Sequence, residues 1–412
     1  MASNNHFFTI IKTTNKARVG KIETPHGIIF TPSFLFCGTQ GTIKNLENTR
    51  LKSLKTQILL CNTFHLLEDK NRIVKGGGIH KFIGWDGPIL TDSGGYQIFS
   101  LGFGSVSAEI KGNRGNYQGF KSNIVKMTKN DVTIRNPRNG NLIKLSPEIS
   151  IDLQCSIGVN FVVSMDECTP FHFTYEKTRK ALFRSIDWGK KSIEYFNKYK
   201  KPYQKLYGIA QGSVYKDLRD LSVKFLKENP TDCIAIGGSL GKDKSQMYDI
   251  VGYTMDQLRD WVHGEKPRPV HLLGIGDKVD IIFGVDKGID TFDCVSPTRL
   301  SRHGTALLSY IDDNGKDTIN LKNQCYIDDF KPIEEGCFCE TCQNFSRSYI
   351  NYLIKRKEMI VTSMLAVHNI YAMNKFFHNI RDQILSDNWD VWKKEQLEKL
   401  KNNYKFLNDI NF

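Results

Sequence analysis

The sequence predicts an α/β protein built on a (β/α)8 TIM barrel, and its apolar runs are the main reason. Eight short apolar runs recur along the 412 residues, and each ends in glycine or polar residues. Runs of this kind suit strands that are buried on both faces of a parallel sheet. They lie at 32–39, 58–63, 88–95, 161–167, 206–212, 233–238, 271–276 and 289–294.

Helical patterns separate several of these runs. The patterns lie at 175–198, 214–228, 243–262 and 277–288. Strands that alternate with helices favour a closed barrel, whose active site lies at the carboxyl ends of the strands. A doubly wound open sheet is the competing interpretation, and the number of strands does not exclude it.

One connection is too long for a single barrel helix. Residues 97–147 hold a stretch rich in Gly, Asn and Ser, and then two alternating segments around Asn139-Gly140. An Asn-Gly pair between alternating segments is typical of a hairpin. We therefore expect an insertion over the mouth of the barrel, where long loops are often functional.

A cysteine cluster follows the barrel pattern. The stretch GCFCETC contains Cys337, Cys339 and Cys342, and His368 lies further on in a segment with a helical pattern. Three thiolates and an imidazole form a complete ligand set for one tetrahedral Zn²⁺. Because such a site has no open position for substrate, we expect a structural ion. Chance clustering of cysteines is the alternative.

These features divide the chain into three parts. We expect residues 1–325 to form the barrel with its insertion, and residues 326–380 to form a helical zinc-binding subdomain. A helical, polar C-terminal tail is expected at 381–412.

Several predicted strands end in carboxylates. Three acidic residues at one rim, with no histidine cluster beside them, argue against a barrel metallohydrolase. They suit displacement at a sugar carbon, where one carboxylate attacks and another handles protons. Capping of the following helices is the simpler alternative for any one of them. The strand-end residues are Asp92, Asp166, Gln211, Gly238, Gly274 and Asp293.

Composition bounds the partners and the compartment. Lys and Arg number 57 against 44 Asp and Glu, a net charge of +13, which moderately favours a nucleic acid as partner. The N-terminus lacks a basic segment followed by an apolar run, and no stretch of eighteen apolar residues occurs. We therefore expect a cytoplasmic protein without a membrane span, in which disulfides do not form.

Longer motifs carry a resemblance to a known family. The segments TDSGGYQIFSL, DECTP, GIAQGSVYKDLRDLSV, AIGGSLG, LLGIG and GIDTFDCVSPTR, together with the cysteine cluster, resemble the tRNA-guanine transglycosylases, from about residue 17 to about 380. The resemblance implies a (β/α)8 barrel with a zinc subdomain. It also implies an enzyme that exchanges guanine at wobble position 34 of tRNAs with a GUN anticodon for a 7-deazaguanine.

The resemblance assigns a role to each matching residue. It makes Asp293 the nucleophile and Asp92 the general base toward the incoming base. It makes Asp166 the acceptor for the purine N1 and amine groups, and it pairs Gln211 and the Gly238 N–H with O6. Ser239 lies in the same base-binding loop. The base is expected to lie between Tyr96 and Leu273.

The resemblance also implies partners. Arg299 and Arg302 match arginines that contact the nucleotides flanking the target, and Tyr349 matches an aromatic residue of a homodimer contact. Bacterial members take the precursor base preQ1, whereas eukaryotic members take the bulkier queuine.

Two departures from the family pattern affect the substrate. Gly241 stands where bacterial members carry Val, which enlarges the pocket and favours queuine over preQ1. Against this, Cys168 in DECTP is the residue of bacterial members. A turn that requires positive φ is the alternative explanation for glycine at position 241. The insertion around 102–130 is longer than expected, and it could cover the pocket or extend the tRNA surface.

Other function classes are less consistent with the motifs. A non-catalytic tRNA-binding subunit of the same fold is the main alternative, but the retained carboxylates argue against it. Exchange on DNA or on free nucleosides is less favoured, because the cysteine subdomain and the two arginines point to tRNA. A zinc hydrolase would need an open metal site, which a Cys3His set does not provide.

Overall fold

A closed barrel of eight parallel strands forms the centre of the molecule. The computed structural model describes residues 6–103, 122–238 and 240–408. Each of the eight predicted runs overlaps one barrel strand, so the barrel prediction is confirmed. The strands are β4 (Ser33–Cys37), β5 (Leu59–Cys61), β6 (Ile89–Thr91), β10 (Phe161–Val163), β11 (Lys205–Ala210), β12 (Cys233–Ile236), β13 (Val270–Leu272) and β14 (Thr291–Asp293).

Pairing of the last barrel strand with the first closes the sheet. β14 pairs in parallel with β4, with Thr291 opposite Ser33 and Asp293 opposite Leu35. An open doubly wound sheet would leave both of these edges unpaired, so this pairing excludes it.

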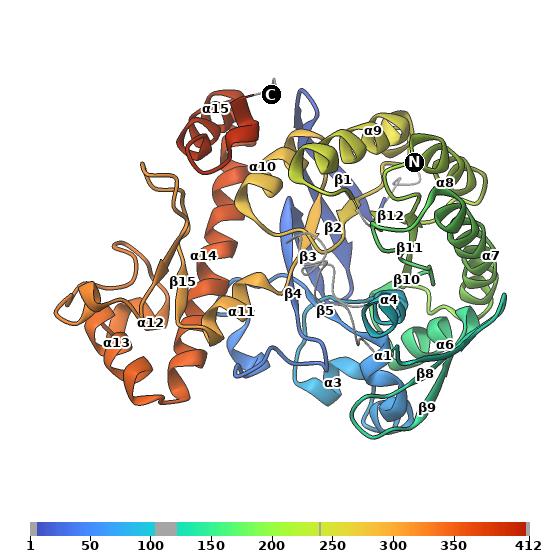
Figure 1. Ribbon diagram of the computed structural model, residues 1–412, viewed down its shortest axis with the longest axis horizontal. Coiled ribbons are helices and arrows are strands. Elements are labelled where there is room, and N and C mark those ends of the chain that lie inside the picture. The colour runs from blue at the N-terminus through green and yellow to red at the C-terminus, as the bar shows by residue number, and fades with distance from the viewer. Residues whose placement is uncertain (1–5, 104–121, 239, 409–412) are drawn as a thin grey trace, which may run out of the picture.

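Helices surround the barrel (Figure 1). All four predicted helical segments are present, with boundaries that shift by at most two residues. They are α7 (Tyr175–Tyr199), α8 (Lys216–Glu228), α9 (Lys244–Val262) and α10 (Lys278–Asp286). The other helices of the barrel half are α1 (Thr63–Leu66), α2 (Lys70–Lys75), α3 (Ile79–Ile83), α4 (Gly95–Phe103), α6 (Pro147–Ile157) and α11 (Ser296–Arg302).

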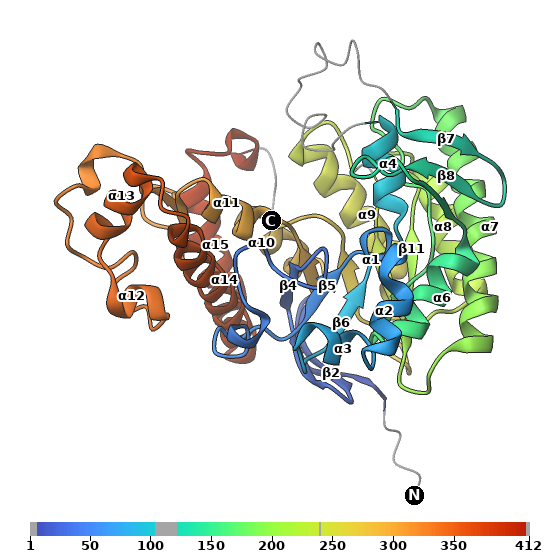
Figure 2. The ribbon, with the colours of Figure 1, turned by 90° about the horizontal axis from the view of Figure 1, so that it is seen from below.

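A three-stranded antiparallel sheet precedes the barrel, and the sequence analysis did not anticipate it. It consists of β1 (Phe8–Thr14), β2 (Ala17–Thr24) and β3 (Gly27–Thr31), and it lies beneath the barrel in Figure 2. Its buried Phe8, Ile22 and Ile29 pack with side chains from inside the barrel. Because β3 ends two residues before β4 begins, this sheet covers the amino end of the barrel.

The predicted hairpin in the insertion is confirmed. β7 (Ile124–Met127), β8 (Val132–Arg135) and β9 (Leu142–Leu145) form an antiparallel sheet, and Gly140 has φ of 75° in the connection between β8 and β9. The Trp188 indole on α7 donates to the Lys129 carbonyl at 2.8 Å, which holds this sheet against the barrel. Much of the 102–130 segment, including 104–121, lies outside the described residues.

The C-terminal part is mainly helical. It contains a short hairpin of β15 (Thr305–Leu307) and β16 (Thr318–Asn320), followed by helices. Helix α14 crosses the predicted boundary at residue 380 and packs against β4, β2 and α11. The helices are α12 (Glu340–Asn344), α13 (Arg347–Arg356), α14 (Ile360–Leu385) and α15 (Trp389–Leu400). Within the described residues, no helix is long and apolar enough to cross a membrane.

A buried ion pair ties the N-terminal sheet to the base of the barrel. Arg18 on β2 donates from Nε to Asp290 Oδ1 at 3.0 Å, and neither side chain is exposed. The same guanidinium donates to the carbonyls of Val262 and Arg268. Asp290 also accepts from the Val270 amide at 2.7 Å, so one carboxylate joins β2, β13 and β14.

Replacement of Arg18 by methionine should leave the Asp290 carboxylate buried without a counter-charge. We expect Arg18→Met to lower the free energy of unfolding by about 3–5 kcal/mol, as measured by urea denaturation. Arg18→Met/Asp290→Asn should recover part of the loss. As a control, Lys52→Met removes an exposed pair with Asp86 and should cost less than about 1 kcal/mol. Equal losses of unfolding free energy in Arg18→Met and Lys52→Met would contradict this account.

Candidate active site and metal centre

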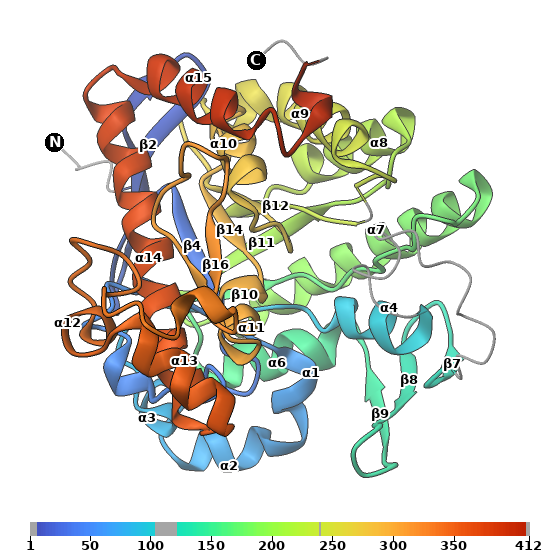
Figure 3. The ribbon, with the colours of Figure 1, turned by 60° about the vertical axis from the view of Figure 1, so that its left-hand side comes forward.

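The predicted site residues meet at the carboxyl end of the barrel. Because the strands are parallel, residues that follow them gather at one rim. The helices α4 and α11, which follow β6 and β14, lie beside the barrel strands (Figure 3). The rim residues and their positions are Asp92 after β6, Asp166 after β10, Gln211 after β11, Gly238 after β12, Leu273 after β13 and Asp293 at the end of β14.

Asp166 and Gln211 form the polar floor of the site. The Gln211 amide donates to Asp166 Oδ2 at 2.6 Å, and the Ser93 hydroxyl donates to Oδ1 at 2.9 Å. Gly238 has φ of 87°, and a Cβ there would lie 2.4 Å from Gln211 Oε1. Burial raises the pKa of Asp166, against the lowering effect of its two donors. The floor thus places an acceptor beside an amide, as a purine edge requires.

Asp92 is held by the neighbouring strand connection. Its Oδ1 accepts from the backbone amides of Thr63 at 3.0 Å and Gly94 at 3.1 Å, and its Oδ2 accepts from the Asn62 amide. Burial, with smaller contributions from the charges of Asp293 and Asp166, raises its pKa to about 7. A carboxylate with a pKa near neutrality can both accept and return a proton.

Asp293 has an asymmetric set of donors. Its Oδ1 accepts from the Gly274 amide at 2.8 Å and contacts His271 Nε2 at 3.0 Å. Its Oδ2 has only the Cys37 thiol, 3.8 Å away, among the contacts of the described residues. One oxygen is therefore fixed, while the other is less restrained.

The predicted metal ligands come together in the C-terminal part. Cys337, Cys339, Cys342 and His368 are all buried, and their ligand atoms lie within 4.8 Å of one another. The three sulfurs lie 3.3–3.8 Å from His368 Nδ1. A tetrahedron with Zn–S bonds of about 2.3 Å has ligand–ligand edges of about 3.8 Å. The arrangement therefore fits one tetrahedral ion.

A hydrogen bond sets the tautomer of the histidine ligand. His368 Nε2 lies 2.8 Å from the Leu307 carbonyl on β15, which can only accept. Nε2 therefore carries the proton, and Nδ1 presents a lone pair to the three sulfurs.

Comparison with known proteins agrees with the site. The family model described as "Queuine tRNA-ribosyltransferase" matches residues 13–402. The chain belongs to the queuine tRNA-ribosyltransferase family. A protein of that name from Roseiflexus sp. (strain RS-1) is 39% identical over 93% of this chain and 96% of its own length. Another, from Protochlamydia amoebophila, is 40% identical over 90% and 93%. The resemblance found in the sequence motifs is thereby confirmed.

The remaining residues assigned from the family motifs lie near the rim. Tyr96 is in the first turn of α4, and it is 46% exposed. Partial burial raises its pKa, and among the smaller effects the charge of Arg299 lowers it and that of Asp293 raises it. A Cβ on Gly237 would lie 3.1 Å from Leu273 and 3.3 Å from the Gln211 amide, so Leu273 lies beside the floor.

The structure also places the two assigned arginines and the glycine at position 241. Arg299 and Arg302 are exposed on α11, directly after the strand that carries Asp293. Gly241 has φ of 135°, and a Cβ there would meet Gln246 and the Met247 amide. The turn alone therefore favours glycine at position 241. Ser239 lies outside the described residues.

Sequence reasoning missed several residues that support the family's site. Ser93 donates to Asp166 and Asn62 donates to Asp92, while Cys37 and His271 lie against Asp293. His271 could have been found, because residues two apart in an extended run share a face, and the predicted run 271–276 contains both His271 and Leu273. The others follow only from the three-dimensional arrangement.

The metal centre should be required for the stability of the C-terminal part. We expect Cys342→Ala to lose its bound metal, as measured by inductively coupled plasma mass spectrometry, and to lower the melting temperature. Cys325→Ala is the matched control, because Cys325 is exposed and outside the cluster. Retention of one ion per chain by Cys342→Ala would contradict the assignment.

Proposed function

We propose that this chain is a tRNA-guanine transglycosylase that acts through a covalent ribosyl-aspartate intermediate. The observation that supports this most strongly is Asp293, a carboxylate with one oxygen held by donors and the other less restrained. In the proposed reaction, this pentosyltransferase exchanges guanine at wobble position 34 of tRNAs with a GUN anticodon for a 7-deazaguanine.

The first half of the proposed reaction releases guanine. An oxygen of Asp293 attacks C1′ of the ribose, the C1′–N9 bond breaks, and its electron pair stays on N9 of the leaving base. Guanine leaves after N9 takes up a proton from solvent. The positive charge that develops at C1′ is stabilised by the nearby carboxylates, as in other displacements at an anomeric carbon.

The second half attaches the incoming base. Asp92 removes the proton from N9 of the 7-deazaguanine, N9 attacks C1′, and the ester bond to Asp293 breaks to restore the carboxylate. The raised pKa of Asp92 suits this transfer, because a base with a pKa near the operating pH is both ionised and sufficiently basic.

Recognition of the base is assigned to the floor of the site. Asp166 accepts from the purine N1–H and exocyclic amine, and Gln211 and the Gly238 N–H donate to O6. Tyr96 and Leu273 would stack on the two faces of a base that has been flipped out of the anticodon loop. Ser239 and Gly241 complete the base-binding loop.

The preference for queuine over preQ1 is the finer part of the proposal. It rests on the small residue at Gly241, which would leave room beside the 7-substituent. Since φ at Gly241 independently favours glycine, a direct comparison of the two bases is the decisive experiment.

Charge and exposure support tRNA as the partner. The net charge of +13 attracts a polyanion, and exposed Arg299 and Arg302 follow the nucleophile strand where flanking nucleotides would lie. We assign the metal as Zn²⁺ with a purely structural role, because four protein ligands leave no position for substrate.

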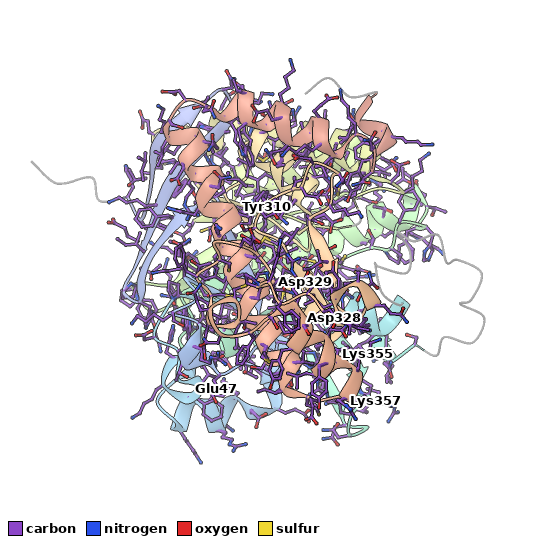
Figure 4. The ribbon with its side chains drawn as sticks, turned by 90° about the vertical axis from the view of Figure 1, so that its left-hand side faces the viewer. Glu47, Tyr310, Asp328, Asp329, Lys355 and Lys357 are labelled. Atoms are coloured by element: carbon purple, nitrogen blue, oxygen red, sulfur yellow. The ribbon has the colours of Figure 1, made fainter. Side chains whose placement is uncertain are left out.

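We further propose a homodimer that forms through the C-terminal part. Tyr349 on α13 is 44% exposed and stacks on Phe345, and Tyr352 one turn later is 51% exposed. Figure 4 labels Lys355, near the end of α13, and Lys357, which follows it. Exposed aromatic residues of this kind are typical of protein interfaces.

The dimer can be tested by light scattering. Tyr349→Glu/Tyr352→Glu should convert a dimer to a monomer, because charge would be buried at the interface. Tyr199→Glu, at an exposed tyrosine on α7, should leave the mass unchanged. A monomeric wild-type protein would contradict the proposal.

Base exchange tests the function itself. Purified protein is given a GUN-anticodon tRNA preloaded with labelled guanine, and then queuine or preQ1. We expect wild type to release the label, with queuine faster than preQ1, and Asp293→Asn to release none because it lacks the nucleophilic oxygen. Binding of tRNA without release by wild type would instead indicate the non-catalytic subunit.

Activity should depend on the ionisation of Asp92. The ionised form accepts the proton, and its pKa is about 7, so kcat should rise roughly tenfold per pH unit below that value and level off above it. Asp92→Asn should lack this rise and should be slower by at least about 100-fold. A flat wild-type profile between pH 5 and pH 8 would argue against Asp92 as the base.

A further inference from the structure

His271 is a buried histidine that directly contacts the nucleophile. It lies in the middle of β13, opposite Thr291 of β14, and is 1% exposed. Residues two apart on a strand share a face, so Thr291 and Asp293 both point toward the His271 side. His271 Nε2 lies 3.0 Å from Asp293 Oδ1, and its Nδ1 lies 2.9 Å from the Thr291 hydroxyl.

The surroundings define the tautomer of this imidazole. Asp293 must be ionised to attack, and a carboxylate only accepts hydrogen bonds, so Nε2 carries the proton. When the ring carries only this proton, Nδ1 is an acceptor, and the Thr291 hydroxyl can donate to it. The buried Tyr207 ring on β11 lies edge-on to the His271 ring, with their centroids 6.2 Å apart. Thr291 and His271 therefore form a polar chain that ends at Asp293.

The two oxygens of Asp293 are thereby made different. The Gly274 amide and His271 both donate to Oδ1, whereas Oδ2 has only the Cys37 thiol at 3.8 Å. Burial raises the pKa of Cys37 well above its usual value, so it is a neutral and weak donor. Oδ2 is therefore the oxygen that can leave its partner and reach C1′.

We propose that His271 is a positioning residue that holds Asp293 Oδ1, so that Oδ2 attacks C1′. It also stabilises the Asp293 carboxylate when the Oδ2–C1′ ester bond breaks in the second half-reaction. The inference rests on the proposed transglycosylase function. In the covalent intermediate, Oδ2 is bonded to C1′ and Oδ1 is the carbonyl oxygen of a neutral ester.

The two half-reactions use His271 differently. In the first, charge leaves the carboxylate as the Oδ2–C1′ bond forms, so a donor on Oδ1 aligns the group without stabilising the transition state. In the second, that bond breaks, its electron pair returns to the carboxylate, and negative charge grows on Oδ1. Donors strengthen as this charge develops, so His271 should accelerate the second half-reaction most.

Three substitutions separate this role from packing. In His271→Gln, the side-chain amide nitrogen can occupy the place of Nε2 and donate to Oδ1. His271→Asn carries the same amide but is too short to reach that place. His271→Phe fills the volume without a donor. Each variant is loaded as the covalent tRNA complex without free base, and then queuine or preQ1 is added and the decay of the complex is timed.

We expect the Phe and Asn variants to slow decay of the complex by about 10- to 100-fold, the effect of losing one hydrogen bond to a charged group. Guanine release should slow less, so the complex accumulates during turnover, while the dissociation constant for tRNA is unchanged. The Gln variant should restore most of the rate. Comparison of Gln with Asn suffices if Phe does not fold.

Two results would overturn the inference. One is decay at the wild-type rate in the Asn and Phe variants. The other is an equal loss of the decay rate in the Gln and Asn variants, which would indicate that His271 acts only through packing. Failure of the underlying function looks different, because wild type itself would then form no covalent complex and Asp293→Asn would behave like wild type.

Discussion

Closure of the barrel between β14 and β4 is the contact on which the other features depend. The pairing makes a ring of strand ends that are far apart in sequence, so Asp92, Asp166 and Asp293 face one space. Asp290 lies just before β14 and joins β13 through the Val270 amide and the N-terminal sheet through Arg18. The base of the barrel is therefore fixed by charge and hydrogen bonds beneath the strand that carries Asp293.

The three rim carboxylates differ because their surroundings differ. Asp92 has a pKa raised to about 7 mainly by burial, although three donors stabilise its charged form. Asp166 is bound to neutral side-chain donors that a purine edge can replace. Asp293 is held on one oxygen only. Environments that separate otherwise identical groups allow one rim to bind, attack and transfer protons.

Helix α14 connects the metal centre to the barrel. It carries the ligand His368, and it packs against β4. The next residue, Asn369, donates to the carbonyls of Pro297 on α11 and Thr305, and accepts from the Leu307 amide. The metal ligands are thus joined to α11, the helix that carries Arg299 and Arg302. A structural ion can in this way influence the surface where the tRNA is proposed to bind, without taking part in the chemistry.

The sequence by itself determined the eight strands, the Asn-Gly hairpin and the cluster of candidate metal ligands. Buried parallel strands need continuous apolar runs, and a turn or a metal site needs particular residues at short spacing, so these features are local in the chain. The N-terminal sheet was missed because its half-exposed strands, such as β1, lack a continuous apolar run.

Only the tertiary structure decided how the side chains of the site contact one another. The contact of His271 with Asp293, the Gln211–Asp166 hydrogen bond and the three donors to Asp92 join different strands or connections. Such contacts depend on strand register and closure, which no local pattern encodes. The sequence therefore predicted which residues carry the chemistry, while the fold determined which atoms and which partners each of them presents.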